Sequence, residues 1–69
     1  IELSPKPGSK VTTAPLKDIK FPEDSIVGVI NHHEKLSIAR GASQLTEEDK
    51  VLIFAKSNAV SKLKKLFES

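Results

Sequence analysis

The chain has 69 residues and a formal net charge of +2, with 11 basic and nine acidic residues of interspersed sign. This length allows one small domain, and the absence of cysteine excludes disulfides, thiolate metal sites and a cysteine nucleophile. No apolar run approaches the roughly 18 residues of a membrane span, and the weak charge with only three aromatic residues does not indicate a nucleic-acid partner. A chain of this size buries only about 60% of the surface that its unfolded form exposes, so we expect a partner to add stability.

Residues 1–13 are expected to form a leading strand and a loop. The letters "IELS" fit a short strand, and the prolines and glycine of "PKPGSKVTT" break regular structure. Because the chain begins without Met in this extended stretch, we expect it to have been cut from a longer protein. Residues 14–69 then form the core of a single domain, 1–69.

A brief helix is predicted after this loop. Thr13 can cap it, and Pro15 fits its first turn, where a missing amide proton costs little. Leu16 and Ile19 then share one face, and Pro22 ends the element.

Three strands are predicted in the middle of the chain. The first, "SIVGVIN", is β-branched and apolar on both faces, with Ile26, Gly28 and Ile30 on one face and Val27 and Val29 on the other.

The next strand, "KLSIAR", alternates cleanly, which predicts Leu36 and Ile38 facing the core. A turn-like stretch with Leu45 as its apolar anchor follows. The strand "KVLIFAK" is apolar on both faces, as is typical of a central strand.

The last segment, "SNAVSKLKKLFES", predicts an amphipathic helix, because its apolar residues are spaced by three and four. Ser57 or Asn58 can cap its start. The order of strand, short helix, three strands and helix predicts an α+β fold, in which a small mixed or antiparallel sheet of about four strands packs against its helices.

The stretch "VINHHEKLSI" places two histidines where the chain must reverse between strands, as in a hairpin. Neighbouring residues on extended backbone point to opposite sides, so His32 and His33 are not expected to hold one metal ion. Asn31 can adopt an unusual turn dihedral while the histidines and Glu34 stay solvated. The remaining alternative is that one histidine contacts a ligand beside the sheet.

No catalytic constellation is recognisable, because no nucleophile has an evident base beside it. The acidic run at residues 47–49 favours a polar turn, in which Asp49 bonds to backbone amides, over a cation site. The lysines of the last helix fit its solvated side better than a membrane or nucleic-acid contact. We therefore expect no enzyme activity.

The order of elements resembles the C-terminal domain of regulator-of-potassium-conductance proteins, the TrkA-C domain. The likeness spans residues 14–67, and its most specific part is "ARGASQLTEEDKVLIFAK". Gly41, Leu45 and Asp49 fit the family pattern of a turn, an apolar residue and an acidic residue before the last strand. Ala39 stands where the family commonly has Pro, and Glu48 where it commonly has Gly.

The resemblance implies a cytosolic regulatory domain that works as a homodimer and gates a membrane potassium or other cation transporter or channel. It implies an upstream Rossmann-type nucleotide-binding domain in the full protein, and a location at the inner membrane through the transporter. Some members bind a small nucleotide such as cyclic di-AMP in the cleft between two copies. A ligand that fits one dimer arrangement better than another would shift the population of the two.

The same resemblance indicates where a ligand would bind. Family clefts lie beside an Asp-Ile-basic motif, which here is Asp18, Ile19 and Lys20. Lys20 offers a point charge for a phosphate where an Arg would give a two-pronged contact. The alternatives to ligand contact are that Ile19 packs in the core and that Lys20 lies on a solvated surface.

Asn31, His32 and His33 are secondary ligand candidates, and a histidine in the cleft would respond to mildly acidic pH. Two other functions stay open on sequence alone. One is an assembly module without a ligand, and the other, less favoured, is a small basic nucleic-acid binder.

Overall fold

The computed structural model describes all of residues 1–69. A short strand β1 (Glu2–Leu3) is followed by two 3₁₀ helices, η1 (Lys10–Thr12) and η2 (Leu16–Asp18). The remaining elements are the strands β2 (Ser25–His32), β3 (Lys35–Ile38) and β4 (Asp49–Ala55) and the helix α1 (Ser57–Glu68). No helix is both long and apolar enough to cross a membrane.

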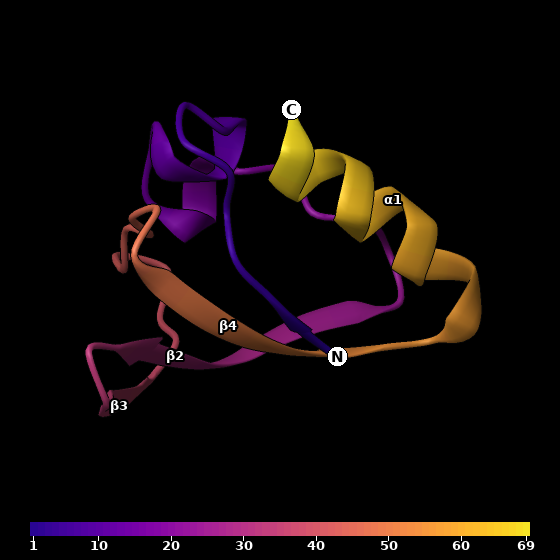
Figure 1. Cartoon of the computed structure of the whole chain (residues 1–69). Helices are drawn as coiled ribbons and strands as arrows, with labels where there is room; N and C mark the ends of the chain where they lie inside the picture. The colour runs from indigo at the N-terminus through magenta and orange to yellow at the C-terminus, as the bar shows by residue number, and fades with distance from the viewer.

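The four strands form one sheet in the order β1-β4-β2-β3, and all neighbours are antiparallel. The strand β4 is central, as its sequence predicts. The helix α1 and the leading loop with its 3₁₀ helices lie on one side of this sheet, and no element covers the other side (Figure 1). The predicted α+β fold, with four strands and a C-terminal helix, is confirmed.

The core lies between α1 and the covered side of the sheet, which we call the inner face. Strand alternation sends Val51 and Ile53 of β4 inward, where both are fully buried. They join the buried cluster made by Val11, Leu16, Ile30, Leu45, Val51, Ile53, Leu63 and Phe67. A small sheet and one amphipathic helix thus share a single core.

The leading loop is fastened to α1 by a buried serine. The Ser9 side chain accepts a hydrogen bond from the Val11 amide at 3.3 Å, capping η1, and donates one to the Leu66 carbonyl at 3.1 Å. The predicted cap at Thr13 is wrong, because Thr13 ends η1 and its hydroxyl donates back to Lys10. Only a 3₁₀ turn with Pro15 as its N-cap follows.

A β-bulge in β2 changes which residues share a face. The register with β4 shifts between Val27 and Val29 at Gly28, so that Ile26 and Val29 lie on one face and Val27 and Ile30 on the other. The predicted grouping of Ile26 with Ile30 is therefore wrong. One extra residue reverses the alternation of everything that follows it.

The prediction that Leu36 and Ile38 face the core is also wrong, since both side chains are 70% exposed. Ile38 pairs with Val29 and Leu36 with Asn31, which places them on the uncovered side of the sheet. The alternation identified the two faces of β3, but α1 covers the opposite one.

The helix α1 begins at Ser57 without the predicted cap by Ser57 or Asn58. Lys56 occupies the N-cap position in extended conformation and makes no side-chain capping bond. The Asn58 side chain instead donates to an Asp24 carboxylate oxygen at 3.3 Å, which ties the helix start to the loop before β2.

Candidate functional site

The uncovered side of the sheet, which we call the outer face, is largely apolar. Ile26, Leu36 and Ile38 are each 70% exposed, Phe54 is 61% exposed and Leu52 38%. These five side chains come from three adjacent strands, so they form one surface rather than scattered contacts.

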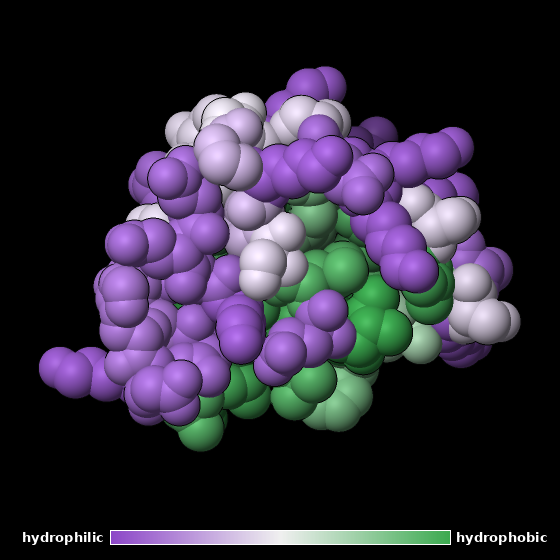
Figure 2. Space-filling view, in the orientation of Figure 1, coloured by the Kyte–Doolittle hydropathy of each residue, from purple (hydrophilic) through white to green (hydrophobic).

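Few charges interrupt the outer face. The strand positions that face outward by register are Glu2, Ile26, Val29, Asn31, Leu36, Ile38, Lys50, Leu52 and Phe54. Figure 2, in which the sheet is seen from its edge, shows hydrophobic surface below α1 and along the lower border of the molecule, where the outer face begins, while hydrophilic side chains dominate the left of the view. A surface of this kind is typical of a protein-protein contact.

A groove with a volume of about 490 Å³ lies between the segment before β2 and the last turns of α1. Three lysines, Lys20, Lys62 and Lys65, line it together with Phe21, Leu66 and one acidic residue, Glu23. Three ammonium groups against one carboxylate, beside two apolar side chains, suit an anionic ligand that carries a flat ring. We call this hollow the lysine groove.

The β2–β3 hairpin turns through His33 and Glu34, whose φ angles are 49° and 68°. Positive φ at both central residues is the type I′ geometry of two-residue hairpins. The predicted hairpin is confirmed, but the unusual dihedrals belong to these residues and not to Asn31, which stays in β2 opposite Lys50.

The ring of His32 contacts a buried carboxylate. Its Nδ1 lies 2.5 Å from Oδ1 of Asp49, which is only 3% exposed. The other Asp49 oxygen accepts a hydrogen bond from the Thr46 amide at 2.8 Å. The predicted polar turn, ending with Asp49 on a backbone amide, is confirmed.

The six ligand candidates from the sequence fall into two groups. Lys20 lines the lysine groove, while Asp18 is exposed at the end of η2 and Ile19 packs partly buried against the core. Asn31, His32 and His33 lie at the far end of β2, which is eight residues long. No hollow is lined by members of both groups, so one chain does not bring all six together.

The structure adds functional candidates that the sequence did not single out. Lys62 and Lys65 were read only as the solvated side of a helix, yet they share the lysine groove with Lys20. Glu48 lies 3.3 Å from His33. Both associations join segments far apart in the chain, and no local pattern signals them.

A family model described as the TrkA-C domain matches residues 1–68. The chain belongs to the TrkA-C domain family.

Relatives of this TrkA-C domain include a Trk system potassium uptake protein TrkA homolog 2 from Methanosarcina mazei. The two are 41% identical over 68 residues, which is 99% of this chain and 15% of that protein. A TrkA homolog from Archaeoglobus fulgidus is 36% identical over 52 residues, covering 75% of this chain and 12% of its own length. The TrkA-C domain thus spans a small part of the relatives that it matches.

A solved structure described as "Structure of RCK domain with cda" superposes on the TrkA-C domain with a TM-score of 0.86. It covers 99% of this chain and 96% of that chain at 22% identity. At this identity the likeness concerns the fold alone, and it agrees with the predicted α+β class of one small sheet with a C-terminal helix.

Proposed function

We propose that this TrkA-C domain is a cytoplasmic regulatory domain of a potassium or other cation transport system, which controls a membrane transporter through a ligand-dependent homodimer. The outer face is the observation that carries this proposal. Apolar side chains that are 61–70% exposed on three strands favour a partner that covers them. The names of the relatives supply the transport system.

A second copy of the same chain is the partner that fits the outer face best. At its border the face carries one Glu and one Lys, Glu2 and Lys50, so two copies related by a twofold axis can place opposite charges together. The private core is small, with only eight residues in the buried cluster. When two copies pair through their outer faces, each copy buries its apolar side chains against the other, which adds the burial that such a short chain lacks.

The lysine groove supports a phosphate-bearing ligand, and we propose a small nucleotide such as cyclic di-AMP. Lys20 contributes a point charge to the phosphate, while Phe21 offers a flat apolar surface. Asp18 and Ile19 precede Lys20 in the same segment and would set its position. Asn31, His32 and His33 stay outside this groove, and a ligand would reach them only from a second copy.

Regulation then follows from differential affinity. A ligand that binds one dimer arrangement more tightly than another shifts the population by that difference, and ligands without such a difference shift nothing. The rest of the protein, proposed to include a Rossmann-type domain and to contact the transporter, would read the change. The domain contributes binding and assembly to this process, not catalysis.

A thermal-shift screen with cyclic di-AMP, mononucleotides and inorganic phosphate tests the ligand part of the proposal. A ligand that binds only the folded state must raise the melting temperature by mass action. We expect Lys20→Gln and Lys62→Gln to reduce the shift. Lys64→Gln is the matched control, because Lys64 is an exposed lysine of the same helix outside the groove.

The outcomes separate the alternatives. A dimer whose melting temperature ignores every nucleotide would be an assembly module without an effector. Equal shifts in Lys20→Gln, Lys62→Gln and Lys64→Gln would contradict the lysine groove as the binding place. Retention of DNA or RNA that disappears steeply with added salt would favour the nucleic-acid alternative over both.

A further inference from the structure

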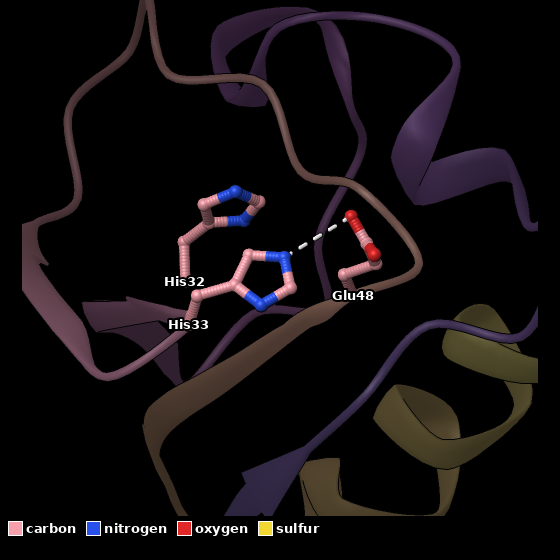
Figure 3. A group of neighbouring side chains, drawn as sticks. All are labelled: His32, His33 and Glu48. Atoms are coloured by element: carbon pink, nitrogen blue, oxygen red, sulfur yellow. Dashed lines mark ion pairs between the residues drawn. The ribbon is translucent and has the colours of Figure 1, made fainter.

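Three metal-ligating side chains converge at the tip of the β2–β3 hairpin. One nitrogen from each ring of His32 and His33 and one oxygen of Glu48 all lie within 4.8 Å of one another. Figure 3 shows the Glu48 side chain reaching toward His33, with the His32 ring beside them. We propose that this cluster binds a divalent transition-metal ion of the zinc class.

The hairpin geometry explains why adjacent histidines can share an ion. Side chains of neighbouring residues diverge on extended backbone. His33 is not extended, because its backbone adopts the left-handed conformation with φ at 49°. The two rings consequently lie with their centroids 4.4 Å apart and edge to face. The sequence disfavours a shared ion because neighbouring side chains on extended backbone point to opposite sides. That reason does not apply at this turn, where the backbone is not extended.

The distances lie close to those of a tetrahedral site. Ligand atoms about 2.0–2.1 Å from a zinc ion are about 3.3 Å from one another. His33 Nε2 and Glu48 Oε1 already lie 3.3 Å apart. The third ligand lies within 4.8 Å of the other two and has to approach by up to about 1.5 Å, a movement that exposed side chains such as these can make.

Asp49 gives the cluster the support that metal-binding histidines commonly have. Its buried carboxylate contacts Nδ1 of His32 and so restrains the ring, which means that the ion would bind at Nε2 of that ring. A carboxylate behind a histidine orients the ring and makes it a better ligand. With Glu48, two acidic groups also offset the charge of a divalent ion.

The donor set selects the kind of ion. Two imidazoles and one carboxylate match zinc sites with three protein ligands and one open position. Mg²⁺ and Ca²⁺ prefer sites made of oxygen alone, so they are expected to bind much more weakly. The ion would join the hairpin to the turn before β4, since Glu48 immediately precedes that strand.

Titration of the 69-residue chain with Zn²⁺, competed against a chromophoric chelator, measures affinity and stoichiometry. We expect one ion per chain, and Co²⁺ in its place should show the intense visible bands of a tetrahedral complex. Mg²⁺ and Ca²⁺ should not compete at equal concentration. This surface is separate from the lysine groove, so the result does not depend on whether a nucleotide binds.

Two variants and one control test the residues. His33→Asn removes the imidazole while keeping a residue type that tolerates positive φ, and Glu48→Gln removes the carboxylate charge; each should weaken Zn²⁺ binding at least tenfold. Glu47→Gln is the matched control, because Glu47 is the neighbouring exposed carboxylate outside the cluster, and its affinity should be unchanged.

Three results would overturn the proposal. They are no Zn²⁺ binding by the unmodified chain, equal binding by His33→Asn and Glu47→Gln, and a stoichiometry of one ion per two chains, which would indicate bridging between copies. Circular dichroism melts of each variant, recorded without metal, verify that a lost affinity is not lost folding.

Discussion

The two faces of strand β4 carry similar residues in opposite environments. Val51 and Ile53 point inward and are fully buried, whereas Leu52 and Phe54 point outward and are 38% and 61% exposed. Successive side chains of β4 point to opposite faces of the sheet, but these side chains on both faces are apolar. Its sequence is that of a strand covered on both sides, and the chain covers only one.

The difference between the faces comes from the number of covering elements. The inner face meets α1 and the leading loop, which together supply Val11, Leu16, Leu63 and Phe67 to the core. The chain has no second long helix to place on the outer face. The inner face therefore accounts for the folded core, and the outer face is the surface available for the proposed association.

The largest expected effect is a difference in unfolding free energy between alanine substitutions of two phenylalanines, one on each face. Phe67 is 1% exposed in the core, and Phe67→Ala should cost about 3–5 kcal/mol of unfolding free energy by opening a cavity. Phe54→Ala on the outer face should cost about 0.5 kcal/mol or less in the monomer. Urea denaturation of both variants at low protein concentration makes the comparison. Equal losses would show that the outer face contributes to the fold of the single chain.

A charge on the outer face should break association while the fold stays intact. In Ile38→Lys the new ammonium groups meet apolar surface or each other across the twofold axis, and the dimer dissociation constant should rise at least tenfold. Sedimentation equilibrium measures it. Lys64→Glu, on the exposed side of α1, is the control for a charge change elsewhere, and it should leave the constant unchanged.

A smaller effect is expected at the bond that fastens the leading loop to α1. Ser9→Ala removes the η1 cap and the bond to the Leu66 carbonyl, and should cost about 1 kcal/mol. Thermal denaturation measures the loss. Ser61→Ala, at an exposed position within the same helix, should not destabilise. A stable Ser9→Ala variant would mean that the loop is held sufficiently by its apolar contacts and by the backbone bonds from Lys6 to Phe67 and from Lys10 to Ser69.

The smallest effect on folding is expected at the bulge. A methyl group at Gly28 would lie 2.7 Å from a ring carbon of Phe54, so Gly28→Ala must displace that ring. Because the ring is exposed and can move, the unfolding free energy should change by about 0.5 kcal/mol or less. The dimer should weaken, though less than in Ile38→Lys. Unchanged association would indicate that Phe54 lies outside the contact.

The sequence was sufficient for the order of elements and not for their relation to the core. Periodicity predicted β2, β3, β4 and α1, and the hairpin between β2 and β3, because these depend on neighbouring residues. It did not predict that Leu36 and Ile38 face away from α1, since alternation defines two faces without naming the covered one. The Gly28 bulge changed the remaining assignments in β2.

The candidate functional residues were predicted in part for the same reason. Lys20 was found through a local motif, and its companions on α1 are more than 40 positions away in the chain. The histidines were recognised, but the positive φ at His33 that brings their rings together was not. Glu48 looked like a turn residue because its contact with His33 depends on how β2 pairs with β4.

Sedimentation velocity of the unmodified chain across a wide concentration range tests the central claim most directly. If the outer face is covered by a second copy, the weight-average sedimentation coefficient should rise with concentration from that of a 7.5 kDa species toward that of its dimer. A folded chain that stays monomeric at the highest concentration would contradict the account, because the exposed side chains of the outer face would then have no twin to cover them.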